Sequence, residues 1–176
     1  HSRKIFELWS KSELEAIGVY EVEFDNTNKK NEKWYINTDQ SFAFAGGKIT
    51  ASYGSATARA HADTLYTNQD KTDGKIPTGK DVGDLAAEGL KTVLIRTVKK
   101  QAAGILQDTD WYIVRKADAG TAVPSAITNH RAAVRTKAAE METAITNASN
   151  TPALETLYTY TEQEDGSVTR PLGELP

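Results

Sequence analysis

The chain has 176 residues, of which 39% are hydrophobic, and its 21 basic and 24 acidic side chains give a formal net charge of −3. This length supports one modest core or two small lobes, and the nearly balanced charge argues against a surface built to hold nucleic acid. The chain has no cysteine, which excludes disulfides and thiolate metal sites, and we expect neither a membrane span nor a secretory signal because no apolar run is long enough.

A short helix is the first predicted element. Ser10 and Glu13 have the spacing of a capping box, in which each side chain hydrogen bonds the backbone amide of the other residue. The box favours a helix over residues 11–17, and Gly18 can adopt the positive φ angle that ends it.

The first 53 residues are predicted to form a small β-rich module. Strands are expected at 19–24, 33–37, 42–45 and 48–53, with Gly46–Gly47 as a two-residue hairpin turn. In the first strand Tyr20, Val22 and Phe24 alternate with other residues, so we expect them to share a buried face. The simplest product is a small antiparallel sheet, which must pack on the rest of the chain or on a partner chain.

Two polar segments are predicted to lie outside the main body. Residues 54–81 are rich in Ala, Thr, Asn, Asp and Gly, and this length without periodicity is typical of a functional arm or a linker. Residues 159–176 follow a short helix that Thr151 can cap and Pro152 can start, and they form a polar, proline-bearing tail. We expect the arm to order against neighbouring subunits and the tail to be extended and able to reach another subunit.

Residues 82–158 are predicted to form an antiparallel helical hairpin. A first helix begins near Asp84 and has an apolar stripe formed by Leu90, Leu94, Val98, Ala102, Ile105 and Leu106. A short second helix covers Asp110 to about Asp118. A third helix has its own stripe, formed by Ile127, Val134, Ala138, Met141 and Ile145.

The connection between the two long helices is a specific corner. Its predicted structural residues are Thr109, Asp110, Trp111, Arg115, Gly120 and Pro124. Thr109 or Asp108 caps the short helix, Gly120 stops it, and Pro124 suits the first turn of the next helix. Asp110 favours the positive end of the helix dipole, Trp111 is expected to fill the space between the long helices, and Arg115 is expected to hold backbone carbonyls.

This corner also carries a resemblance. The pattern LxxTDWYxxRxxxxGTxxPxxxxxxRAAVR is matched by Leu106, Thr109, Asp110, Trp111, Tyr112, Arg115, Gly120, Thr121, Pro124, Arg131, Ala132, Ala133, Val134 and Arg135. It resembles a helical hairpin of tailed-bacteriophage tail-fibre and tail-fibre-assembly proteins and related small virion proteins. The segment LWSxxELxAIGVY, from Leu8 to Tyr20, is similar to one that often precedes such hairpins. The resemblance implies a virion or assembly role and brings no catalytic residues with it.

No chemical motif is intact in the sequence. Gly74 to Lys80 has phosphate-loop spacing, but Asp81 stands where a hydroxyl must hold magnesium, and no strand precedes the loop. The acidic residues before Gly74 resemble a calcium loop, but the glycine is one place late and Gly79 stands where a glutamate is needed. His61 and His130 lack partners at metal-ligand spacing. We therefore expect no enzyme activity, cofactor or metal.

Together these features predict an α+β protein with a small N-terminal sheet, a long polar arm and a C-terminal helical hairpin. The resemblance implies a virion structural protein, made in the host cytoplasm, in or near the phage tail as a tail-fibre or tail-adaptor component. The alternative is a tail-fibre assembly chaperone that does not remain in the particle. The expected partners are other virion proteins and further copies in a trimer or ring, with no nucleic acid and no membrane. Candidate interface residues are Arg131, Arg135, Tyr158 and Tyr160.

Overall fold

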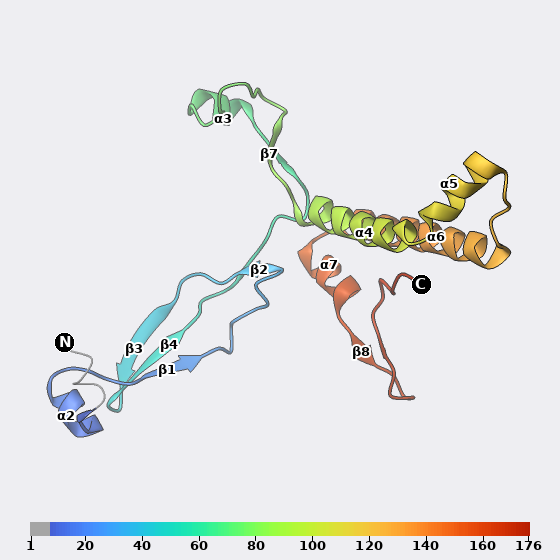
Figure 1. Ribbon diagram of the computed structural model, residues 1–176. Coiled ribbons are helices and arrows are strands. Elements are labelled where there is room, and N and C mark those ends of the chain that lie inside the picture. The colour runs from blue at the N-terminus through green and yellow to red at the C-terminus, as the bar shows by residue number, and fades with distance from the viewer. Residues whose placement is uncertain (1–7) are drawn as a thin grey trace. The chain divides into compact units, whose positions relative to one another are not determined.

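The computed structural model describes residues 8–176 and divides the chain into two compact units, His1–Ala58 and Arg59–Pro176. Helices and small, largely antiparallel sheets occur together, which confirms the predicted α+β class (Figure 1). Each unit is described separately below.

In the described part of the first unit, the predicted helix is present as α2 (Lys11–Ala16). Its capping box is present: the Ser10 N–H donates to Glu13 Oε2 at 2.8 Å, and the Glu13 N–H donates to Ser10 Oγ at 3.4 Å. Gly18 has a φ angle of +79°, as expected for the residue that reverses the chain after the helix.

A three-stranded sheet follows, with the order β1 (Val22–Asp25), β4 (Lys48–Ser52), β3 (Ser41–Ala45). Strands β3 and β4 form the predicted hairpin, and both turn glycines have positive φ angles, 58° for Gly46 and 77° for Gly47. Strand β1 pairs with β4 in parallel, so the expectation that all pairs in this sheet are antiparallel is wrong. A long connection follows β1, and strand β4, later in the chain, pairs with β1 along the edge that β3 does not occupy. The local sequence does not specify this pairing. The long connection is called the β1–β3 connection below.

The β1–β3 connection contains β2 (Tyr35–Ile36), which pairs antiparallel with β5 (Thr57–Ala58). Trp34 and Tyr35 are buried there. The predicted strand at 33–37 is therefore present in a shorter form, and its pairing extends the first unit beyond the predicted boundary at residue 53 to Ala58.

The second unit opens with a two-stranded ribbon in place of an arm without structure. Strand β6 (Thr64–Leu65) pairs antiparallel with β7 (Leu85–Ala87), and the short helix α3 (Asn68–Thr72) lies between them in the chain. Because β7 takes up residues that we had expected in the first long helix, α4 begins at Leu90 and not near Asp84. The Gly89 N–H donates to Asp63 Oδ1 at 2.7 Å, which ties the start of α4 to the ribbon.

Helices α4 (Leu90–Gln107), α5 (Asp110–Ala119) and α6 (Ser125–Asn147) follow in order. Helices α4 and α6 lie side by side and run antiparallel (Figure 1): Lys91 Nζ donates to the Thr146 carbonyl at one end, and Arg131 Nη1 donates to the Leu106 carbonyl at the other. Their facing stripes form the core of this unit. Its buried apolar residues in the two helices are Leu94, Val98, Ala102, Val134, Ala138, Met141 and Ile145.

The C-terminal residues fold back onto the second unit. Helix α7 (Thr151–Tyr158) is capped by Asn150, while the Thr151 hydroxyl, buried, donates to the Arg59 carbonyl at 2.6 Å. Strands β8 (Thr161–Glu162) and β9 (Val168–Thr169) then form a hairpin. Leu172 is 2% exposed and its N–H bonds the Leu157 carbonyl, so the expectation of an extended tail is wrong.

Candidate interaction surfaces

The corner between α4 and α6 is organised by Arg131. Its guanidinium donates to the Leu106 carbonyl at 2.6 Å, to Thr109 Oγ1 at 2.5 Å and to Asp110 Oδ1 at 2.8 Å. Arg131 is 6% exposed, so its prediction as a candidate interface residue is wrong. One arginine therefore joins a carbonyl in the last turn of α4 to the first acidic residue of α5. This is the role we had expected of Arg115.

Some of the other predicted corner residues have the expected positions, but not all of them make the expected contacts. Gly120 has a φ angle of +69° and ends α5, and Pro124 immediately precedes α6. Thr109 has the N-cap position, but its hydroxyl makes no cap bond to α5 and donates to the Leu106 carbonyl at 3.0 Å. Asp110 lies in the first turn of α5, where its partner is Arg131.

Trp111 does not fill the space between the long helices. It is 51% exposed, and α5 has no buried residue at all, so this prediction is wrong. The Trp111 and Tyr112 ring centroids are 3.9 Å apart, and the Arg115 guanidinium lies 4.7 Å from the first centroid and 5.4 Å from the second. We call these three residues the aromatic platform. The Nε atom of Arg115 is buried and has no hydrogen-bond partner among the described residues, and Val114 beside it in the chain is 66% exposed.

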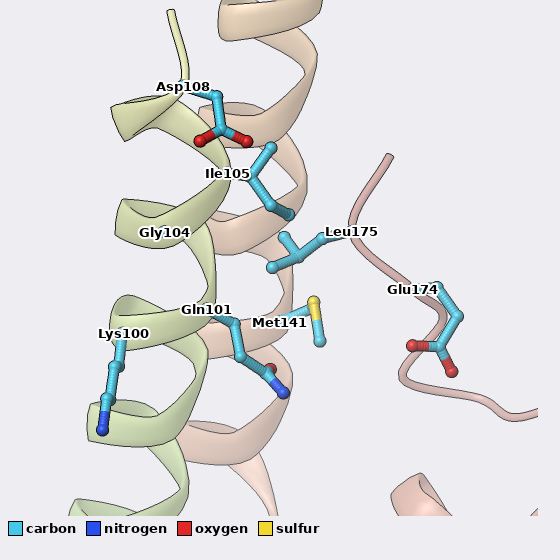
Figure 2. Close-up of a pocket in the computed structure, with 8 residues that line it drawn as sticks. All are labelled: Lys100, Gln101, Gly104, Ile105, Asp108, Met141, Glu174 and Leu175. Carbon is cyan, nitrogen blue, oxygen red and sulfur yellow. The ribbon is translucent and has the colours of Figure 1, made fainter. Parts of the chain in front are cut away.

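A groove of about 590 Å³ lies between α4, α6 and the C-terminal residues. Figure 2 shows its lining, which consists of Lys100, Gln101, Gly104, Ile105, Asp108, Met141, Glu174 and Leu175. The side chains of Ile105 and Leu175 point toward one another across it. The groove thus combines apolar side chains with charged groups at its rim.

The two predicted interface tyrosines hold the C-terminal residues in place. The Tyr160 hydroxyl donates to Glu174 Oε1 at 2.6 Å, and Arg170 pairs with the same carboxylate at 2.7 Å. The Arg170 guanidinium lies 5.2 Å from the ring centroids of both Tyr158 and Tyr160. Burial raises the pKa of Tyr158, and the hydrogen bond to Glu174 raises the pKa of Tyr160. Tyr160 remains 53% exposed, and Arg135 on α6 is exposed as well.

One face of the β1–β4–β3 sheet in the first unit is apolar. The register places Val22, Ile49 and Phe44 in one row and Phe24, Ala51 and Phe42 in the next. Phe24, Phe42 and Phe44 are 67%, 64% and 59% exposed, so the predicted burial of the face that carries Phe24 is wrong for Phe24. The opposite face is polar and includes an ion pair between Glu23 and Lys48. We call the two rows the apolar sheet face.

The segments with motif-like spacing form ordinary turns. Gly74 and Gly79 have positive φ angles, and α3, not a strand, precedes them. Lys71 pairs with Asp81 at 3.0 Å, which lowers the pKa of that carboxyl. Within residues 8–176, no three His, Cys, Asp or Glu side chains gather as metal ligands, and no helix is long and apolar enough to cross a membrane.

Sequence reasoning missed Arg131 and the phenylalanines of β3. Arg131 occupies a position of the α6 apolar stripe, between Ile127 and Val134, and a charged residue in such a stripe indicates a buried, paired side chain. The sequence does not indicate that Phe42 and Phe44 are exposed, because alternation predicts which residues share a face of the sheet but not whether another element covers that face.

Comparison with known protein families, with curated proteins and with solved structures gives no match.

Proposed function

We propose that this protein is a structural component of a bacteriophage virion, a tail-fibre or tail-adaptor protein that acts by binding other virion proteins and further copies of itself. The resemblance of the corner pattern and of the Leu8–Tyr20 segment to tail-fibre and tail-fibre-assembly proteins is the basis for the phage assignment. In the proposal the protein is located in or beside the tail.

The observation that carries the binding role is the exposure of the apolar sheet face. Three phenylalanine rings, each more than half exposed, lie together on one side of a small sheet. Contiguous apolar surface of this kind is typical of protein–protein interaction sites. A small sheet of three strands gains its stability by packing this face on something else.

The corner supports the same role. Arg131 fixes the geometry between α4 and α5 by three hydrogen bonds, so α5 is held at a defined angle while none of its residues is buried. The aromatic platform is therefore presented on a rigid support. Tryptophan, tyrosine and arginine are the residues enriched at the energetic centres of protein interfaces.

Binding rather than catalysis is part of this proposal. The strongest candidate for nucleotide chemistry is the loop that contains Lys80, where Lys71 is already paired with Asp81. We expect no saturable binding of ATP by equilibrium titration of the whole chain. Saturable binding that Lys80→Ala abolishes would overturn this part of the proposal.

The groove between α4, α6 and the C-terminal residues favours a second candidate function, that of a tail-fibre assembly chaperone. Its apolar side chains and charged rim suit reversible holding of a partner segment. Sedimentation of an infected-cell lysate distinguishes the two functions. A virion component sediments with particles and remains with them after a high-salt wash, whereas a chaperone stays in the soluble fraction.

A further inference from the structure

Strand β3 is a sheet edge to which no other strand is paired within residues 8–176. It lies at the end of the order β1–β4–β3, and all five of its residues, Ser-Phe-Ala-Phe-Ala, are exposed and uncharged. The opposite edge, β1, carries Glu23 and Asp25, and charged side chains are a common device against edge-to-edge pairing. Strand β3 carries no such device and no proline.

The free backbone groups of this edge belong to Phe42 and Phe44. The Ile49 N–H donates to the Glu21 carbonyl at 3.2 Å, on the β1 side of β4, so the pair Ile49–Phe44 is not hydrogen-bonded. Hydrogen-bonded and non-hydrogen-bonded pairs alternate along an antiparallel ladder. The pair Ala51–Phe42 is therefore also of the second kind, and the N–H and C=O groups of both phenylalanines point away from the sheet.

The strand is also self-complementary. An antiparallel copy of β3 related by a two-fold axis at Ala43 places Phe42 opposite Phe44 of the second copy, and Ser41 opposite Ala45. Both phenylalanine pairs then have the outward backbone groups that a hydrogen-bonded pair requires, while the central Ala43 pair is of the non-hydrogen-bonded kind. Pattern and backbone geometry thus agree on one register.

The side chains fit the same arrangement. Phe42 and Phe44 lie on the apolar sheet face, so pairing brings each ring beside a ring of the second copy, and such cross-strand aromatic pairs stabilise sheets. Ala43 lies on the polar face, beside Thr50 and in the same row as Glu23. Across the axis, Ala43 faces only Ala43 of the second copy.

We propose that β3 pairs antiparallel with β3 of a second copy of this chain, about a two-fold axis at Ala43, to form one continuous six-stranded sheet. This inference names a contact for the self-association in the proposed function, but it does not depend on the virion assignment, because the contact forms between free copies in solution.

The test uses charge at the axis. Ala43→Lys and Ala43→Glu each place two like charges directly opposite one another, on the exposed polar face where neither variant disturbs the unit's own packing. We expect each variant to weaken self-association of the full chain at least about tenfold, measured by sedimentation equilibrium. An equimolar mixture of the two variants should recover the wild-type mass, because the introduced ammonium group of one variant attracts the introduced carboxylate of the other.

Thr50→Lys is the matched control. It adds the same charge on the same face and in the same register row as Ala43, but on the central strand, one strand further from the axis. It should leave the mass at the wild-type value, twice 19.2 kDa for a simple dimer. Recovery in the mixture also excludes misfolding as the cause of dissociation, since two misfolded variants would not restore one another.

Three results would overturn the proposal: a wild-type chain that remains monomeric at high concentration, a mass that Ala43→Lys does not change, or a closed trimer, which a two-fold contact cannot form. None of these results bears on whether the protein is found in particles, so this test can fail while the proposed function stands.

Discussion

Replacing Arg131 by methionine should destabilise the second unit strongly while leaving its apolar stem in place. The guanidinium makes three hydrogen bonds, one to the Leu106 carbonyl at the end of α4 and two to Thr109 and Asp110 at the start of α5, and Arg131 is 6% exposed. A hydrogen bond from a charged donor contributes about 1.5–3 kcal/mol to stability. Methionine also removes the cost of burying the guanidinium charge, which offsets part of the lost hydrogen bonds. We expect a loss of about 2–3 kcal/mol in the free energy of unfolding.

Two further variants divide this loss among its sources. Asp110 has a side chain that is 57% exposed, so Asp110→Asn should cost below about 1 kcal/mol despite the 2.8 Å ion pair. Arg135 is an exposed arginine one turn along the same helix, and Arg135→Met should change stability by less than about 0.5 kcal/mol.

Thermal unfolding followed by circular dichroism at 222 nm measures these effects, because α4 and α6 contribute most of the helix signal. For a unit of this size a change of 1 kcal/mol moves the midpoint by roughly 4 °C, so Arg131→Met should lower it by roughly 10 °C. The reasoning is refuted if Arg131→Met behaves like Arg135→Met, or if Asp110→Asn costs as much as Arg131→Met.

Three other predictions concern packing and pH. Gly89→Ala should lower the free energy of unfolding by more than about 3 kcal/mol, because a Cβ at this position would collide with the backbone carbonyl of Ala62. Gly104→Ala should raise the free energy of unfolding by about 0.5–1 kcal/mol, because Gly104 lies in mid-helix with open space around it, and urea unfolding compares the two variants. Leu172→Ala should cost about 2–4 kcal/mol in the same assay, and an effect no larger than that of Val168→Ala, at a 60% exposed position, would show that the C-terminal residues are not packed. The hydrogen bond from the Gly89 N–H holds the pKa of Asp63 below its ordinary value of 3.8, so the ionised carboxylate contributes its full stabilisation above pH 3.8 and this stabilisation is lost as the pH falls through the lower folded pKa. When the free energy of unfolding is measured against pH, Asp63→Asn should lose less stability in acid than the wild-type chain. An equal loss in the two proteins would contradict this reasoning.

Elements that depend on neighbouring residues were predictable from the sequence. The Ser10–Glu13 capping box, the Gly46–Gly47 turn and the stop of α5 at Gly120 all formed as expected. In each case the residues that act are within a few positions of one another, so local physical chemistry decides the outcome.

Features that depend on distant residues were not predictable. The parallel pairing of β1 with β4, and the return of Leu172 to the Leu157 carbonyl, join segments that are separated in the chain. Arg131 has the role expected of Arg115, and Trp111 is exposed and does not fill the corner, for a related reason. Periodicity assigns a residue to a face, but which side chain fills a junction depends on the angle at which the helices meet.

Absolute quantification of this protein in purified phage particles, relative to the major capsid protein by mass spectrometry, tests the central claim most directly. The account predicts a fixed copy number that is unchanged by further purification. Absence from particles, in spite of abundance in infected cells, would contradict a structural role in the virion.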